Sequence, residues 1–298
     1  MRGVVVALGN FDGVHVGHQA VLRRAVEEGR RRGMRVVAAT FDPHPRSVLW
    51  PGKQPGLLTT LELRRETLVR YGVDEVCTIR FDKELSKKSP EEFVGEVLVG
   101  EVGAEVVVVG ENFRFGHRAV GDVRALGELM KSHGGVAVGV GIRDGDGGAA
   151  ISSTRIRELL SEGDVGGAGR LLGRPYVLRG EVVAGDGRGE SIGFPTANVL
   201  PDPDLLVPAR GVYAGVVSFG EQEHVACTNV GLAPTFGRGE SRVEAHLLDF
   251  GGDLYGRVVD VSFIERIRPE KRFSGVEELV EQIGRDVEAA RRIVGGEA

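Results

Sequence analysis

Two histidines three positions apart lie in residues 9–18, Gly-Asn-Phe-Asp-Gly-Val-His-Val-Gly-His, and imidazoles so placed can contact phosphate oxygens. The segment follows an apolar run at 4–8 and precedes a helical pattern at 19–32. The first amides of a helix bind anions readily, because they have no partners inside the helix. His15 and His18 could therefore stabilise the charge of a phosphate under transfer. The alternative is a plain strand-to-helix turn with two surface histidines.

The first half of the chain alternates between β-branched runs and helical patterns, which is typical of parallel strands joined by crossover helices. Strands are expected at 4–8, 35–40, 75–79, 105–109 and 136–142, and helices at 19–32, 61–71, 90–99 and 123–133. Ser89 and Glu92 flank the start of the third helix as a capping box, with Pro90 at its first position. Ligands of such sheets bind at the carboxyl ends of the strands. We therefore expect the loops at 9–18, 41–45 and 110–116 to form one site.

A further phosphate-binding element is predicted at residues 151–157, Ile-Ser-Ser-Thr-Arg-Ile-Arg, which leads into a helix expected to end near Ser161. Ser153 and Thr154 can cap this helix and contact phosphate, and Arg157 offers a bidentate guanidinium. A capped helix with solvated arginines explains the same residues equally well.

The pattern changes near residue 173, after which short alternating segments are separated by Gly, Asp and Pro turns. Strands are expected at 176–183, 211–219, 224–230, 242–250 and 257–268, and one amphipathic helix at 275–293. This order indicates a small antiparallel β-barrel with a helix against it. We therefore predict an α/β domain with a Rossmann-like parallel sheet at 1–170 and a barrel domain at 171–298, with the boundary near residues 165–175, where the stretch 163–173 is rich in glycine.

Four glycines within nine positions mark the start of residues 185–198 in the expected barrel. Such a loop costs conformational entropy, and its backbone amides can hold phosphates. Thr196 and Asn198 add a hydroxyl and a carbonyl oxygen, which are hard ligands suited to Mg²⁺. The spacing differs from that of the phosphate loop that ends in Gly-Lys-Ser/Thr, so the spacing alone is a weak indication.

One later strand carries a candidate general base. Residues 243–250 alternate between apolar and polar side chains, which places Glu244, His246 and Leu248 on one strand face. Glu244 could accept a proton if that face lines a pocket. A solvated strand face is an equal alternative.

Composition excludes several classes of function. The net charge of −5 over 298 residues gives no electrostatic basis for a nucleic-acid partner. No apolar stretch has membrane-spanning length, and no signal peptide is evident. Cys77 and Cys227 lie far apart in apolar runs, as expected of buried free thiols in a reducing cytosol. We expect a cytoplasmic protein with small-molecule partners and no membrane, and the sequence leaves homo-oligomerisation open.

Taken together, these motifs resemble the bacterial bifunctional riboflavin kinase/FMN adenylyltransferase family, also called FAD synthetases. The resemblance runs nearly end to end and includes 9–18, 41–45, 112–116, 151–157, 193–198, 211–213, 229–236, 243–250, 253–256 and 268–286. The His-x-Gly-His and Ser-Ser-Thr-x-x-Arg motifs are shared by many nucleotidyltransferases. The Phe-Pro-Thr-Ala-Asn motif is much more specific to this family. The presence of both sets of motifs in this order on one chain is highly specific.

The resemblance implies two reactions that use ATP. A kinase transfers the γ-phosphate of ATP to riboflavin, giving FMN, with Glu244 as the base. An adenylyltransferase then joins FMN to the α-phosphate of a second ATP, giving FAD and pyrophosphate, with His15 and His18 as catalytic residues. The resemblance assigns ATP to Gly9, Phe11, Asp12, Gly17, Ser153, Thr154, Arg157, Gly187, Gly193, Thr196 and Asn198. It assigns the flavin to Asn112, Phe113, Arg114 and Phe115, and Mg²⁺ to Thr196 and Asn198.

Four positions depart from the pattern expected of the family, namely Val16, Ala184, Glu190 and Ala233. Glu190 stands in the glycine loop where a basic residue is common, and an acidic group there is unfavourable beside ATP phosphates. One alternative is therefore an enzyme that retains only adenylyl transfer. Two others are a flavin-responsive binding module without turnover and a nucleotidyltransferase for another phosphorylated small molecule.

Overall fold

The computed structural model describes residues 3–141, 151–185, 187–232 and 241–296. The chain forms two compact units. The first comprises Met1–Pro55 and Leu61–Ser153, and the second comprises Gly56–Thr60 and Thr154–Ala298. The predicted boundary at residue 170 separates the parts of the chain expected to carry the two activities. The packing of the chain does not test where each activity resides, so this boundary stays a prediction.

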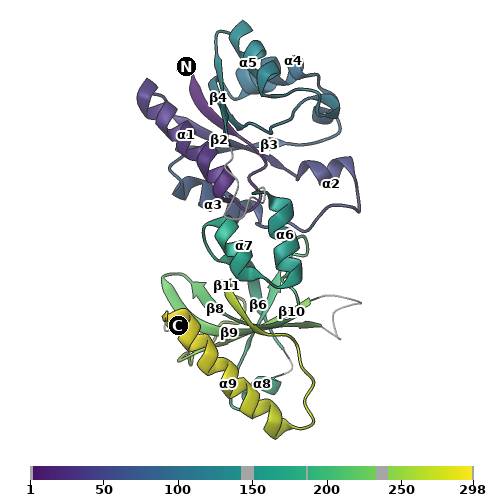
Figure 1. Ribbon diagram of the computed structural model, residues 1–298, viewed down its shortest axis with the longest axis vertical. Coiled ribbons are helices and arrows are strands. Elements are labelled where there is room, and N and C mark those ends of the chain that lie inside the picture. Colours follow the sequence, from purple (N-terminus) through teal and green to yellow (C-terminus); the bar gives the residue numbers. More distant parts are fainter. Residues whose placement is uncertain (1–2, 142–150, 186, 233–240, 297–298) are drawn as a thin grey trace. The chain divides into compact units, whose positions relative to one another are not determined.

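The first unit contains a five-stranded parallel sheet, as the alternating pattern predicts (Figure 1). Its strands are β1 (Val4–Leu8), β2 (Val36–Asp42), β3 (Glu75–Arg80), β4 (Ala104–Gly110) and β5 (Val136–Val140), in the order β3-β2-β1-β4-β5. β1 pairs in parallel with both β2 and β4, so the strand order reverses beside β1. Ligands of open parallel sheets bind at such a reversal, outside the carboxyl ends of the strands.

Helices cover both faces of this sheet because its strands are apolar on both sides. Val5 and Ala7 of β1 pack with α1 (Val16–Arg32) and with α3 (Leu61–Arg70). Val4, Val6 and Leu8 pack instead with the π-helix η2 (Phe93–Glu101) and with α5 (Val123–Ser132). Burial on both faces is typical of a parallel sheet between two helical layers.

The helix predicted at 90–99 divides in two. A single α-helical turn, α4 (Pro90–Glu92), has the predicted capping box, since Ser89 and Glu92 each accept the other's backbone amide through their side chains. The chain then continues as η2, which ends with Val102 N donating to the carbonyl of Val97. Three short helices that were not predicted are α2 (Pro45–Leu49), η1 (Leu85–Lys87) and η3 (His117–Ala119).

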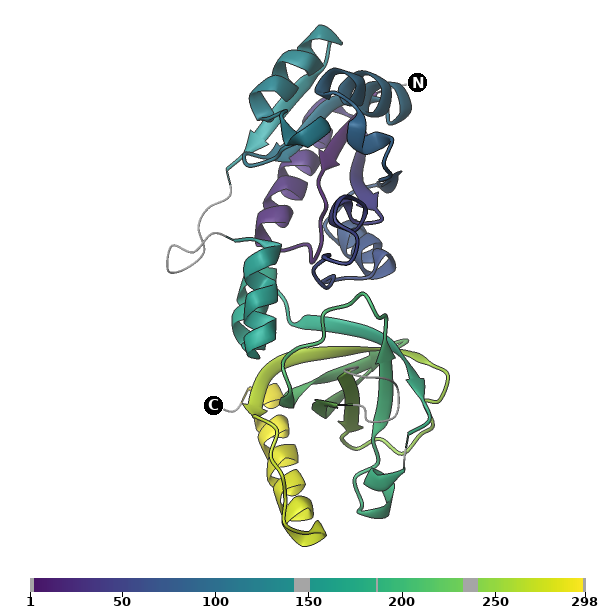
Figure 2. The same cartoon turned by 90° about the vertical axis from the view of Figure 1, so that its right-hand side faces the viewer.

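The second unit is built on a closed six-stranded barrel, which confirms the predicted architecture (Figure 2). Its strands are β6 (Tyr176–Val183), β7 (Ala197–Pro201), β8 (Gly211–Phe219), β9 (Gln222–Leu232), β10 (Ser241–Leu247) and β11 (Val258–Arg268), in the order β10-β7-β6-β11-β8-β9. A short helix, α8 (Arg188–Ser191), lies between β6 and β7. β7 was not predicted, because its five residues end in a proline and carry little alternation.

Residues outside the predicted barrel domain complete the barrel core. The side chains come from α6 (Ser153–Glu162) and α7 (Val165–Leu172), and those before residue 171 are Ile156, Leu159, Leu160, Val165 and Ala168. Leu58 joins the same core, and Leu57 pairs by its backbone with Asp204 and Leu206. The glycine-rich stretch predicted as a boundary therefore forms a helix, capped by Asp164 at its start and by Gly173 in the left-handed conformation at its end.

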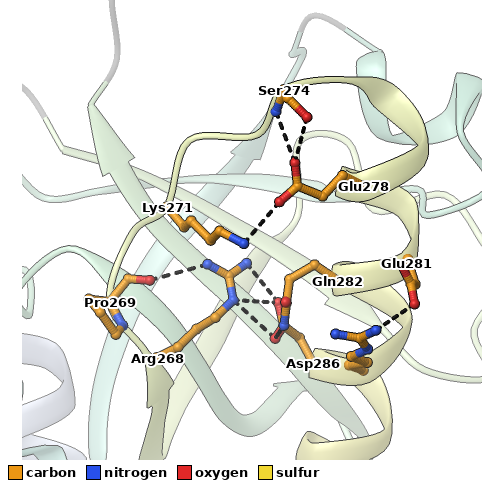
Figure 3. A network of polar contacts seen from close by, with 9 residues as sticks. Arg268, Pro269, Lys271, Ser274, Glu278, Glu281, Gln282 and Asp286 are labelled. Carbon is orange, nitrogen blue, oxygen red and sulfur yellow. Dashed lines mark hydrogen bonds and ion pairs between the residues drawn. The ribbon is translucent and has the colours of Figure 1, made fainter.

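The last helix, α9 (Val276–Gly295), packs against β8, β9 and β11 of the barrel. Figure 3 shows the polar network at this junction, in which Asp286 accepts from both Arg268 and Gln282. Both cysteines are free thiols, as predicted, with Cys227 buried and Cys77 half-buried. Burial raises the pKa of Cys227 to about 12. Among the described residues, no helix combines the length and the apolar character that crossing a membrane requires.

Candidate functional site

The loop that follows β1 holds an unusual backbone. Phe11 and Val14 have φ values of 49° and 43°, and Gly13 has 82°. A β-branched residue rarely takes a positive φ, and such strain is concentrated at functional sites. Neighbouring groups hold the loop, since Thr40 Oγ1 donates to the carbonyl of Asn10 at 2.9 Å and Gln19 Nε2 donates to that of Val14 at 2.9 Å.

The two histidines form a stacked pair at the start of α1. Their ring centroids lie 3.6 Å apart with an interplanar angle of 15°. His15 is the N-cap residue, and its Nδ1 accepts the backbone amide of His18 at 3.2 Å. A neutral His15 therefore carries its proton on Nε2. Burial, followed by the charges of His15 and Arg64, holds the pKa of His18 well below its usual range.

Arg64 of α3 is a site residue that was not predicted from the sequence, and its side chain is only 2% exposed. Its guanidinium lies 3.7 Å from a carboxylate oxygen of Asp12 and donates to the carbonyl of Phe41 at 3.4 Å. Arg64 lies three and four positions before Thr67 and Leu68, so the three side chains share the buried face of α3. That spacing is the signal that could have revealed Arg64 as a buried residue.

Ser153 brings the Ser-Ser-Thr segment to the same loop, because its hydroxyl donates to the carbonyl of Asp12 at 2.9 Å. The predicted residues of the first unit that gather here are Gly9, Phe11, Asp12, His15, Gly17, His18 and Ser153. Thr154 and Arg157 belong to the second unit, where Arg157 Nε donates to the carbonyl of Gly56 at 2.7 Å.

The predicted flavin loop follows β4, next to β1 in the sheet. Asn112 and Arg114 are exposed, and Arg114 pairs with Asp122 at 3.8 Å. Phe115 is buried and stacks on Phe113, with centroids 5.8 Å apart and an interplanar angle of 13°. The loops after β1 and β4 thus lie at the carboxyl ends of the two strands where the sheet order reverses.

In the second unit, strand register places Glu244 of β10 between two asparagines. Glu244 pairs with Asn198 of β7 on one side and with Asn229 of β9 on the other. Asn229 Nδ2 donates to the Glu244 carboxylate at 3.2 Å, and Arg242 forms an ion pair with it at 3.0 Å. The Glu244 side chain is 25% exposed, so solvent or a ligand can reach it. The positions of Asn229 and Arg242 beside Glu244 depend on the register of the paired strands, which the sequence does not reveal.

The glycine loop that begins at Gly185 lies close to Asn198, one of the two asparagines that flank Glu244. A Cβ added at Gly185 would lie 2.1 Å from the amide nitrogen of Asn198, and one at Gly189 would lie 2.3 Å from the carbonyl oxygen of Phe194. His246 Nδ1 lies 2.8 Å from the carbonyl oxygen of Pro195, which ties the loop to β10. Gly187 and Gly193 have positive φ values of 65° and 85°.

The predicted face of β10 is only partly as expected. Glu244 and His246 share one face, whereas β10 ends at Leu247, before the third predicted member, Leu248. Leu248 packs with Ala290 of α9 instead, because the chain turns there and Asp249 takes a positive φ of 57°. Glu190 has an exposed side chain, and Ala233 lies outside the described residues.

Oxygen donors at the second site suit a hard cation. Thr196 and Asn198 are half-buried, and the Asn198 carbonyl oxygen accepts from Arg242 at 2.9 and 3.1 Å. The described residues contain no group of three or more His, Cys, Asp or Glu side chains that could hold a metal by themselves. The donor set therefore fits Mg²⁺ that is bound jointly with phosphate oxygens, as is usual for this ion.

Comparisons with known proteins agree with the two-unit architecture. Residues 1–155 match the family model described as FAD synthetase, and residues 172–294 match the one described as riboflavin kinase. The crystal structure described as a macrolide-efflux protein from Streptococcus pneumoniae is 34% identical, with a TM-score of 0.89. That alignment covers 97% of this chain and 94% of the other.

Curated relatives match over almost their full lengths. The bifunctional riboflavin kinase/FMN adenylyltransferase of Escherichia coli K12 is 39% identical, and the alignment covers 99% of this chain and 94% of the relative. The enzyme of the same name from Bacillus subtilis 168 is 35% identical, with 97% and 92% covered. The chain belongs to the bifunctional riboflavin kinase/FMN adenylyltransferase family.

Proposed function

We propose that this protein makes FAD from riboflavin in two steps, with the kinase reaction in the barrel unit and adenylyl transfer in the parallel-sheet unit. The observation that carries the proposal is the presence of two unlike sites, one in each unit. The first has a strained loop with stacked histidines at a helix start. The second has a carboxylate between two asparagines beside a glycine loop.

In the kinase reaction, the 5′-hydroxyl of the riboflavin ribityl chain attacks the γ-phosphorus of ATP and ADP leaves. Glu244 accepts the hydroxyl proton, and Asn229 and Arg242 hold the carboxylate in place for that transfer. The backbone of the glycine loop, with Gly187 and Gly193, binds the ATP phosphates. Mg²⁺ held by Thr196 and Asn198 would neutralise phosphate charge when bound.

In the adenylyl transfer, a phosphate oxygen of FMN attacks the α-phosphorus of ATP, and pyrophosphate leaves. No covalent bond to the protein is required. His15 and His18 donate hydrogen bonds to phosphate oxygens, and the start of α1 adds its positive dipole, which no acidic residue in the first turn offsets. Gly9, Phe11, Asp12, Gly17 and Ser153 of the same unit complete the proposed ATP site, and the assignment of Thr154 and Arg157 to ATP stays a prediction.

For the flavin of FMN, Asn112, Phe113 and Arg114 are the proposed contacts. Arg114 is exposed and its partner Asp122 is 48% exposed at the side chain, so a phosphate can compete for the guanidinium. Phe115 lies beneath Phe113 in the core, so its proposed part is to support the Phe113 ring. We also propose that the protein works in the cytoplasm, where ATP is available, with small molecules as its partners.

The test is a chromatographic time course of riboflavin, FMN and FAD with ATP and Mg²⁺. The Glu244→Gln variant should lose FMN formation by about 100-fold or more while it still converts supplied FMN to FAD. The His18→Ala variant should do the reverse, with FAD formation about 100-fold lower. Glu223→Gln and His133→Ala change exposed residues outside both sites and should match the parent.

Equal loss of both activities in either variant would contradict the assignment of one reaction to each unit. The parent protein also tests the alternative that Glu190 has abolished the kinase reaction. FAD formed from FMN without any FMN formed from riboflavin would favour that alternative. Absence of both ADP and pyrophosphate release would instead favour a binding module.

A further inference from the structure

Arg64 is a fully buried cation in a site built to receive an anion. Its side chain and that of Asp12 are each 2% exposed. Removing a guanidinium from water is costly unless charge partners and hydrogen bonds compensate. Burial lowers the pKa of Arg64, and the charges of Asp12 and Asp42 act in the opposite direction. A leucine would fill this position in α3 at a lower free-energy cost of burial, so we expect the buried charge to have a function.

The contacts of Arg64 join three separate elements of the first unit. From α3, the guanidinium reaches Asp12 in the strained loop and the carbonyl of Phe41 near the end of β2. The backbone carbonyl of Asp12 also accepts from Ser153. Asp12 is therefore held at its side chain and at its backbone, directly before the residues of positive φ at 13 and 14.

We propose that Arg64 is a positioning residue for adenylyl transfer: it holds Asp12 and thereby the loop that carries His15 and His18, and its fixed positive charge acts on His18. This inference rests on the proposed function of the first unit. Arg64 acts through the loop and the histidines, so it is not a catalytic residue.

The charge matters because the histidine pair must stay unprotonated to keep its geometry. Protonation of His15 on Nδ1 would remove the acceptor that caps the amide of His18. Two imidazoles stacked at 3.6 Å also cannot both carry a charge at low cost. The groups that act on His18 are His15 and Arg64, and Asp12 faces Arg64. A guanidinium keeps its charge at any physiological pH, so its effect on His18 does not fade.

The test compares Arg64→Met, which removes the charge, with Arg64→Lys, which keeps it. Histidine labelled with carbon-13 at Cε1 lets the titration of His18 be followed by NMR among seven histidines, with His18→Ala to assign its signal. In Arg64→Met the pKa of His18 should rise, because the positive charge that disfavours a protonated imidazole is then absent. FMN adenylylation should fall about tenfold or more, mainly in kcat, and its acid limb should move to higher pH.

Arg64→Lys should keep the low pKa of His18 and most of the activity, and Arg65→Met, a change at the exposed neighbour, should match the parent. The NMR signals of His44, His117 and His133, which lie in the same unit as Arg64, report whether that unit is folded in each variant. A folded Arg64→Met variant with the parent's His18 titration and adenylylation rate would overturn the proposal. If Arg64→Met does not fold, Arg64→Lys decides, and a raised His18 pKa in that variant overturns the proposal. A parent without FMN adenylylation would defeat the proposed function, whereas the His18 titration would still test Arg64.

Discussion

Gly185 is a position where a single methyl group should separate the two activities. An added Cβ would lie 2.1 Å from the amide nitrogen and 2.7 Å from the carbonyl oxygen of Asn198, so the amide must move. Arg242 and the proposed Mg²⁺ site both depend on that amide. We expect Gly185→Ala to lower the rate of FMN formation from riboflavin about tenfold or more, with conversion of FMN to FAD unchanged, as initial rates would show.

The matched control is Gly251→Ala, since no atom lies within 4 Å of a Cβ added at Gly251. This variant should keep both rates. A Gly185→Ala variant that makes FMN at the parent rate would remove Asn198 from the kinase site.

Glu28 links the stability of the first unit to pH. This buried carboxylate on α1 pairs with Arg24, Arg31 and Arg32 at 2.9, 2.6 and 3.0 Å. Its hydrogen bond with Arg31 is the main reason that its pKa falls from the ordinary 4.5 to about 2. A carboxylate with a lowered pKa stabilises the fold above its unfolded pKa, and that contribution disappears as the pH falls from about 4.5 to about 2.

Glu28→Gln should therefore lower the free energy of unfolding at pH 7 by about 1–2 kcal/mol, a value kept small because the arginines are partly exposed. The deficit should shrink as the pH is lowered, and denaturant titrations at pH 7 and pH 3 would measure it. Glu27→Gln, at the exposed neighbouring position, serves as the control. A deficit of equal size at both pH values would contradict the assigned role of the charge.

Single residues also show where prediction from sequence stops. Glu244 and Asn198 stand 46 positions apart, and a sequence motif can name each of them without showing that β10 pairs with β7. Asn229 reaches the Glu244 carboxylate only because β10 also pairs with β9, and Arg242 of β10 contacts the same carboxylate. Arg64 escaped prediction for another reason, since an arginine in a charged helix is expected in solvent. Its burial follows from the fold of the loop that contains Asp12, 52 positions earlier in the chain.

The junction of β11 with α9 depends on one buried ion pair (Figure 3). Asp286 is 3% exposed at its side chain and lies 2.7 Å from Arg268. Removing one partner of a buried pair leaves the other charge without compensation. Asp286→Asn should therefore destabilise the second unit by about 2–3 kcal/mol, as the free energy of its unfolding in denaturant would show.

The same helix offers a control of the same type. Glu281 pairs with Arg285 at the surface, with the side chains 67% and 65% exposed. Because exposed pairs contribute little, Glu281→Gln should change stability by no more than about 0.5 kcal/mol. Similar losses in the two variants would mean that burial does not set the strength of these pairs.

Among the secondary-structure elements, long runs were predictable and short ones were not. The strands of the parallel sheet and β6, β8, β9 and β11 of the barrel lie close to the predicted positions, because apolar periodicity is strong there. β7 carries too little alternation to be predicted, and it becomes a strand by pairing with both β6 and β10. Helix α7 was hidden by glycines at 166, 167 and 169, and packing of Val165, Ala168 and Leu172 on the barrel core stabilises it.

For the whole molecule, the packing of α6 and α7 predicts which fragments fold. A fragment that begins at residue 171 lacks Ile156, Leu159, Leu160, Val165 and Ala168 from the barrel core. Each isoleucine, leucine or valine among them stabilises a fold by about 1.5–3 kcal/mol when fully buried. We expect residues 171–298 to melt far below residues 154–298, or to lack a cooperative transition, in thermal unfolding followed by circular dichroism. Equal melting temperatures would show that the two helices do not stabilise the barrel.

The composition of the second unit could not be predicted from local patterns. Residues 56–60 lie in the middle of the first unit's sequence, and no motif marks them as partners of the barrel. Their place depends on a long-range pairing, in which the amide of Leu57 donates to Asp204 and that of Leu206 donates to Leu57. Such pairings carry no periodic signal in either segment.

Because the two partners of this pairing lie far apart in the sequence, a ribosome releases them at different times. Leu57 and Leu58 leave the ribosome early, whereas Asp204 and Leu206 follow about 150 residues later, after roughly ten to thirty seconds of translation. During that interval the two leucines have no barrel to cover them. The nascent chain therefore carries an uncovered apolar segment until most of the protein has been synthesised, which makes this segment a place for a chaperone to bind.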